Sequence, residues 1–303
     1  MKKFAIYTAC IGGYDDIAQP PVVSDQFDYF VFSDHPQDER CGIWKIISTP
    51  IKDNMSPIFL ARYIKTHPHE LLPQYDAWIW VDTNLLFADN FIYNKFADWY
   101  NGSALVAACP HPATDDVYEH IYEMCCFGFE KDIVCLHAMK YLQEHNYPAH
   151  HGLCETGILF RKNISSITEF DERWWWHIQN LSKRDQFSFN YVLYEQQIQW
   201  ESILPYNEPI RQSPHLIYNY HANIASKRKV VKLTQEENIR HYVRKQHPAI
   251  YVPFVEKYKK ISLHNNYPIR LRIWGWYVFP LYVLNPLYTY RLIKRKITKF
   301  HTK

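Results

Sequence analysis

Residues 77–81 are the feature that most restricts the fold of this chain, because five apolar residues, AWIWV, stand together and stop at Asp82. A short apolar run that ends at turn-forming residues predicts a buried strand. Further strands are predicted at 4–10, 29–32, 44–48, 104–109 and 156–160, and helices at 57–67, 116–127, 130–145 and 184–197. Strands that alternate with helices predict an α/β fold whose sheet is at least partly parallel.

Composition excludes several classes of protein. With 47% hydrophobic and 21% charged residues, the 303-residue chain is not globally disordered. P-loop, dinucleotide-binding, serine-hydrolase and zincin motifs are absent from the sequence. The seven cysteines are odd in number and have no CxxC spacing, so we expect no disulfide scaffold or zinc ribbon and a reducing, cytosolic environment.

Polar side chains follow the ends of three predicted strands, at Asp15 and Asp16, at Asp34, and at Asp82 and Asn84. Ligands of open α/β sheets bind outside the carboxyl ends of the strands, so a site is predicted at this edge. Asp82 and Asn84 could both offer oxygen to Mg²⁺ or Mn²⁺ and bridge it to a diphosphate. Taken alone, an Asx turn that ends the strand explains the same two residues.

Other candidate positions also leave two interpretations open. Asp185 and Gln186 could line a ligand site or begin a helix, where Asp complements the helix dipole. Arg62 and Lys65 lie one turn apart on one predicted helix face and could bind phosphate or form a solvated face. Gly157, in the segment Glu155-Thr156-Gly157, would let a ligand approach the backbone.

The histidines give no metal pattern. His67 and His69 have HxH spacing, and His150 and His151 are adjacent. Neither spacing fits a structural zinc site, so these side chains are interpreted as surface or packing histidines.

Four blocks in order resemble a known family. They are YTACIGGYDD at 7–16, IWVD at 79–82, GLCETGILFR at 152–161 and RDQFSF at 184–189. They resemble the glycosyltransferase-like domain of plant mucilage-related proteins and their bacterial relatives, formerly a domain of unknown function, over roughly residues 4–225. More remotely, the layout is similar to glycosyltransferase family 8. The resemblance implies a GT-A-like nucleotide-sugar-binding domain with a mixed, mostly parallel sheet at 1–230, followed by a helical basic and aromatic extension at 231–303.

The resemblance also implies roles for individual residues. The nucleotide would contact Thr8, Ala9, Tyr14, Asp34, Arg62, Lys65 and Lys227. A Mn²⁺ or Mg²⁺ cofactor would be held by Asp82, Asn84 and His221, and the catalytic sugar site would contain Glu155, Asp185 and Gln186. Two positions depart from the family pattern, because Asn84 replaces the second acid of a DxD motif and Ile224 replaces a glycine.

The function implied is transfer of a sugar from a nucleotide-sugar donor to a glycan or lipid-linked glycan acceptor, as in polysaccharide biosynthesis. The diphosphate leaves from the anomeric carbon, and Asp185 could serve as the base if configuration inverts. A retaining outcome stays equally open. The alternatives are a lipid amidase of the ceramidase type, for which no convincing three-ligand hydrolytic site is found, and an inactive nucleotide-sugar-binding module, which Asn84 favours.

The C-terminal tail has its own charge pattern. Residues 257–303 hold 11 basic and no acidic residues, whereas residues 1–256 hold 23 basic and 31 acidic residues. Residues 273–290 are uncharged and rich in Trp and Tyr, with Lys and Arg on both sides, which is typical of an interfacial anchor on an anionic membrane. We therefore expect a cytoplasmic protein that is peripheral on the inner face of the cell membrane. An aromatic segment that packs on the catalytic domain is the alternative, and nucleic acid is not expected as a partner.

Overall fold

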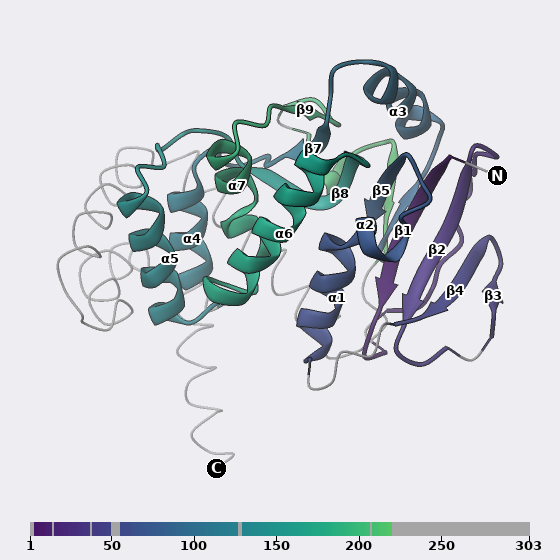
Figure 1. The fold of residues 1–303 in the computed structure, drawn as a ribbon, viewed down its shortest axis with the longest axis horizontal. Coiled ribbons are helices and arrows are strands. Elements are labelled where there is room, and N and C mark those ends of the chain that lie inside the picture. The colour runs from purple at the N-terminus through teal and green to yellow at the C-terminus, as the bar shows by residue number, and fades with distance from the viewer. Residues whose placement is uncertain are drawn as a thin grey trace, which may run out of the picture.

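The structure of the chain, a computed structural model, describes residues 3–13, 15–36, 38–49, 55–126, 129–206 and 208–219. Eight strands form one sheet in the order β3-β4-β2-β1-β5-β8-β7-β9 (Figure 1). They are β1 (Phe4–Cys10), β2 (Phe27–Ser33), β3 (Arg40–Cys41), β4 (Trp44–Ser48), β5 (Ala77–Val81), β7 (Val106–Pro110), β8 (Cys154–Lys162) and β9 (Trp200–Ser202). Strands β4, β2, β1 and β5 are parallel neighbours, while β3 and β8 run antiparallel to theirs. The predicted α/β class with a mixed, mostly parallel sheet is confirmed.

Helices and loops cover both faces of the sheet. The helices are α1 (Pro57–Thr66), α2 (Pro68–Leu71), α3 (Phe91–Asn101), α4 (Val117–Cys126), α5 (Asp132–Glu144), α6 (Ser165–Asn180) and α7 (Phe189–Glu195), with 3-10 turns η1 (Asp185–Phe187) and η2 (Ile210–Gln212). One core packs β-strand side chains such as Tyr7 and Trp78 against α1, α4, α5, α6 and α7. A second core, on the opposite face, packs Ile6 and Ile79 against α3. Successive side chains of a strand point to opposite faces, and both faces are covered. The central strands are therefore apolar at nearly every position.

The helices differ from the prediction in two ways. The helix expected at 184–197 divides into η1 and α7, because the Asp185 carbonyl accepts hydrogen bonds from Ser188 N and from Trp174 Nε1 at 3.1 Å. Helices α3 and α6 were not predicted, although in α6 Ile167, Phe170, Trp174 and Ile178 are buried at helical spacing. The run of three tryptophans hides this period, since Trp176 is exposed.

A buried ion pair fixes the helices that approach the sheet from one side. Arg161 on β8 pairs with Asp171 on α6, and both side chains are fully buried. The same guanidinium donates hydrogen bonds to the Tyr7 hydroxyl and, at 2.6 Å, to the carbonyl of Lys65 in the last turn of α1. Burial raises the pKa of Tyr7, so its hydroxyl stays protonated and donates to the Lys65 carbonyl at 2.7 Å. The position of Lys65 is therefore set from β1, β8 and α6 together.

The carboxyl end of β5 is extended by backbone contacts. Asp82 N donates to Gly157 O at 2.8 Å, and Leu85 N donates to Asp82 O at 2.9 Å to close a turn. The chain then forms β6 (Leu85–Phe87), which pairs antiparallel with β10 (Leu216–Tyr218) in a separate two-stranded sheet. This pairing brings residues 210–218 to the sheet edge where the site was predicted.

Within the described residues, no helix has the length and apolar character needed to cross a bilayer. The expected C-terminal extension at 231–303, including its proposed membrane anchor, lies outside the described residues.

Candidate functional site

A cavity of about 150 Å³ opens at the carboxyl edge of the parallel strands. Its lining comes from segments far apart in the sequence: Arg62, Lys65, Asp82, Asn84, Leu85, Glu155, Thr156, Gly157, Asp185, Gln186, Ile210, Arg211 and Tyr218. Seven predicted site residues therefore meet in one place, namely Arg62, Lys65, Asp82, Asn84, Glu155, Asp185 and Gln186. The lining contains three acidic and three basic side chains, so its formal charges balance.

Asp185 is the acid of the cavity with two cationic partners and a hydroxyl donor at its carboxylate. Its Oδ2 lies 2.7 Å from Lys65 Nζ and 3.0 Å from Arg62 Nη1, and it accepts a hydrogen bond from Thr156 Oγ1 at 2.8 Å. Burial by itself would raise the pKa of Asp185, but the charges of Arg62 and Lys65 and the two hydrogen bonds outweigh it and hold that pKa far below its usual range. Asp185 is therefore a permanent carboxylate, and such a weak base is poorly suited to remove a proton from an acceptor.

Lys65 is not part of a solvated helix face. Its side chain is only 1% exposed, and its ammonium lies between Asp185 and Asp82, 3.7 Å from Asp82 Oδ1. It also lies 5.4 Å from the centre of the Trp80 ring, a cation–π distance. The predicted phosphate contact of Lys65 remains a prediction, and any phosphate would share the ammonium with two carboxylates.

Asp82 retains access to a ligand. Its side chain is 40% exposed, and its Oδ1 accepts a hydrogen bond from Trp80 Nε1 at 2.8 Å. Asp82 Oδ2 makes no hydrogen bond within the described part of the chain. Asn84 and Glu155 line the same cavity, so three oxygen-bearing side chains are available, which is the donor set that Mg²⁺ or Mn²⁺ prefers. The residues present thus fit the hard cation that the resemblance implies.

Gly157 faces the site where a side chain would intrude. A Cβ placed there would lie 3.0 Å from Leu85 Cδ1 and 3.4 Å from Asp82 Oδ2. The absence of a side chain keeps the space beside the Asp82 carboxylate open, as expected for a close approach of ligand to backbone.

The remaining predicted nucleotide contacts lie along the same edge but not in the cavity lining. Thr8 is buried near the end of β1, with its hydroxyl unpaired among the described residues, and Ala9 follows it. Asp34, just past β2, accepts a hydrogen bond from Gly12 N at 2.9 Å. Asp15 Oδ2 accepts one from Thr83 Oγ1 at 3.0 Å, which joins the opening loop to the turn after β5. Tyr14, His221 and Lys227 lie outside the described residues.

Three polar side chains of the cavity were not selected as site residues from the sequence. Thr156 was noted only as part of its segment, and its hydroxyl contact with Asp185 depends on the turn of η1 toward β8. Arg211 and Tyr218 come from η2 and β10, and the guanidinium lies 5.1 Å from the centre of the tyrosine ring. No local motif marks them, because only the pairing of β10 with β6 brings them to the cavity.

Comparison with known proteins gives structural neighbours only. No family matches the chain, and no curated protein matches it either. Among solved structures, the apo bifunctional glycosyltransferase WbbM is 14% identical, with a TM-score of 0.42, over 72% of this chain and 45% of its own. The glycosyltransferase GlyE of Streptococcus pneumoniae TIGR4 is 14% identical, with a TM-score of 0.33, over 66% of this chain and 45% of its own. Its apo form is 13% identical, with a TM-score of 0.34 and coverage of 66% and 44%. The chain thus spans less than half the length of each neighbour.

Proposed function

We propose that the chain is a glycosyltransferase that moves a sugar from a nucleotide-sugar donor to a glycan or lipid-linked glycan acceptor. The observation that carries this proposal is the convergence of the four sequence blocks. Residues 79–82, 152–161 and 184–189 all contribute to one cavity, and the block at 7–16 joins it through Asp15 and Thr83. The pairing of β1, β5 and β8 in the sheet brings three of these blocks together, and η1 adds the polar side chains of the fourth.

The polar groups of the cavity suit the two halves of such a donor. Asp82 and Asn84 offer oxygen to a cation that would accompany a diphosphate. Arg62 and Arg211 add positive charge at the same cavity, and Glu155, Asp185 and Gln186 can bind sugar hydroxyls. Because the formal charges of the lining balance, a diphosphate together with a divalent cation adds little net charge to the site.

In the proposed reaction, the bond between the anomeric carbon and the diphosphate breaks, a bond to the acceptor hydroxyl oxygen forms, and the hydroxyl proton passes to the leaving diphosphate or to water. A Mn²⁺ or Mg²⁺ ion, when bound, would stabilise the charge on the leaving diphosphate. Asp82 would hold that ion, and Lys65 would keep Asp82 and Asp185 in place. Asp185 would accept hydrogen bonds from sugar hydroxyls and position the donor, since its low pKa makes it a poor base.

A screen of nucleotide sugars tests this proposal. Each is offered to the full chain with Mn²⁺, with Mg²⁺ and with a chelator, and both binding and release of nucleoside diphosphate are measured. We expect one donor class to bind and to be hydrolysed or transferred. Binding without turnover would identify an inactive module, to which Asn84 points, and lack of binding by every nucleotide sugar would contradict the proposal.

A further inference from the structure

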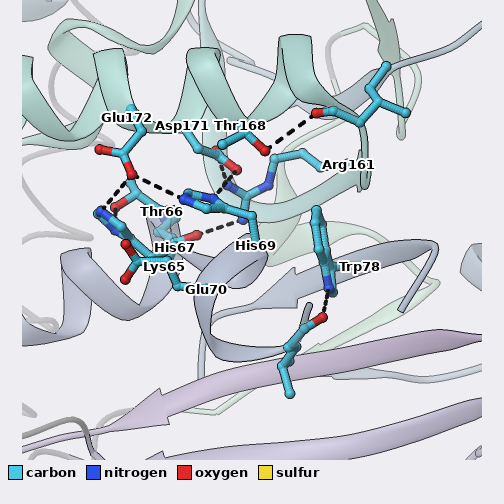
Figure 2. A network of polar contacts seen from close by, with 12 residues as sticks. Lys65, Thr66, His67, His69, Glu70, Trp78, Arg161, Thr168, Asp171 and Glu172 are labelled. Atoms are coloured by element: carbon cyan, nitrogen blue, oxygen red, sulfur yellow. Dashed lines mark hydrogen bonds and ion pairs between the residues drawn. The ribbon is translucent and has the colours of Figure 1, made fainter. Parts of the chain in front are cut away.

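A second polar cluster lies where α1 meets α2, outside the cavity lining. His67 stands between the two helices, Glu70 lies on α2, and Glu172 extends from α6 (Figure 2). One ligand atom from each of these three side chains lies within 4.8 Å of the other two. His67 is buried, with a side chain only 3% exposed, while both glutamates are exposed and reachable from solvent.

The hydrogen bonds of His67 fix which ring nitrogen carries the proton. Nδ1 lies 2.9 Å from the carbonyl of Tyr63, a group that can only accept, so Nδ1 must be the donor. Thr66 Oγ1 lies 2.9 Å from the same nitrogen and donates its own proton to the Arg62 carbonyl at 2.9 Å. Neutral His67 therefore presents an unprotonated Nε2, the arrangement found in metal-bound histidines whose other nitrogen is held by a carbonyl.

That lone pair faces negative charge. Nε2 of His67 lies 3.6 Å from Glu172 Oε1 and makes no hydrogen bond within the described residues. A nitrogen lone pair and two carboxylate oxygens that lie this close to one another form a set of donors that a divalent cation could hold together.

We propose that His67, Glu70 and Glu172 bind a divalent metal ion, with Zn²⁺ as the best fit to one imidazole and two carboxylates. Ligands about 2.1 Å from a tetrahedral Zn²⁺ are about 3.4 Å from one another, close to the observed 3.6 Å. The exposed Glu70 side chain can move inward to complete the set. Three protein ligands leave one coordination position for water.

Neighbouring side chains orient the ligands. The Tyr63 hydroxyl donates to Glu70 Oε2, and His69 Nε2 donates to Glu172 Oε1 at 3.1 Å. A bound ion would fasten α6 to the end of α1, the helix that carries Arg62 and Lys65, and this inference does not rest on the proposed sugar transfer.

The test uses the full chain after treatment with a chelator and dialysis. Zn²⁺ is titrated calorimetrically, bound zinc is counted by elemental analysis, and the melting temperature is measured with and without Zn²⁺. The variants are Glu172→Gln and the double variant Glu70→Gln/Glu172→Gln. Glu169→Gln, an exposed acid on the same helix, is the matched control, and Asp82→Asn removes the candidate cation ligand of the cavity.

We expect the wild type and Glu169→Gln to bind one more Zn²⁺ than the double variant and to melt at a higher temperature when Zn²⁺ is present. Asp82→Asn should keep the thermal shift with Zn²⁺ that the double variant loses. Glu172→Gln should bind at least about tenfold more weakly. Because both glutamates are exposed, the variants should fold, and their melting temperature without Zn²⁺ verifies this. Equal zinc content and equal thermal shifts in the wild type and the double variant would overturn the proposal.

Discussion

Lys65 Nζ lies 2.7 Å from Asp185 Oδ2, although 120 residues separate the two in the chain and both side chains are buried. The contact joins the last turn of α1 to the 3-10 turn before α7, directly beside the cavity. Asp185 therefore both stabilises the fold and lines the cavity, whereas the sequence left open whether it begins a helix or lines a ligand site.

Asp185→Asn should therefore lower both activity and stability. The substitution removes the carboxylate that pairs with the buried Lys65 and the partly exposed Arg62, and breaking a buried ion pair typically costs about 3–5 kcal/mol. We expect a loss of this order in the free energy of unfolding, measured by denaturant titration, and a fall in kcat/KM of orders of magnitude. Asp98→Asn, at an exposed position of α3, is the control and should change neither quantity. Unchanged stability of Asp185→Asn would show that the buried pair is not formed.

The same carboxylate predicts an acid sensitivity. Its pKa in the folded protein is far below the value of about 3.9 for an unfolded aspartate, so the folded state binds fewer protons. The stability that Asp185 contributes is then fully present above about pH 4 and is lost as the pH falls toward the folded pKa. Denaturant titrations from pH 6 to pH 3 should show a smaller loss of stability in Asp185→Asn than in the wild type. Parallel curves for the two proteins would contradict this assignment.

Local sequence patterns predict the strands well, since each central strand is a short apolar run that ends in polar residues. Asp82 and Asn84 follow β5 for this reason, and the position of the cavity at the carboxyl edge follows from the sheet. The spacing of Arg62 and Lys65 shows that they share a helix face. It does not show that Lys65 is buried, because that depends on Arg161 and Asp171 being placed behind it by β8 and α6.

Contacts between distant segments explain what the sequence does not predict. Arg211 and Tyr218 reach the cavity only because β10 pairs with β6. His67 and Glu70 come from the start of α2, whereas Glu172 comes from α6, a helix that the sequence did not predict. The HxH spacing alone therefore gave no reason to expect a metal site. His67 is buried as a packing residue would be, but its Nε2 faces Glu172.

Gly157→Ala should weaken donor binding in a protein that still folds. The added Cβ would meet Leu85 Cδ1 at 3.0 Å and Asp82 Oδ2 at 3.4 Å, so the leucine or the carboxylate must move. Overpacking of this kind costs about 1–3 kcal/mol of stability. We expect the dissociation constant of the nucleotide sugar to rise at least tenfold, measured by calorimetry on protein shown to be folded. Wild-type affinity in this variant would mean that the space beside Asp82 is not used by the ligand.

The basic, aromatic C-terminal tail lies outside the described residues, and its membrane role remains a prediction. Truncation after Ile261 should release the protein from anionic liposomes, because it removes residues 273–290 and the Lys and Arg around them. Sedimentation with liposomes at low salt measures this, and nucleotide binding by the truncated chain serves as the control. Equal sedimentation of the truncated and full-length chains would refute the anchor.

Comparison of Asp82→Asn with the wild type tests the central claim most directly. Asparagine keeps the size of the side chain and the acceptor for Trp80 Nε1 but removes the negative charge that would hold a cation beside a diphosphate. With the donor identified by the screen, transfer and Mn²⁺-dependent binding are measured at equal protein concentration, and the melting temperature serves as the folding control. The account predicts near-complete loss of transfer and loss of the Mn²⁺ dependence at an almost unchanged melting temperature. Transfer by Asp82→Asn at the wild-type rate would contradict it.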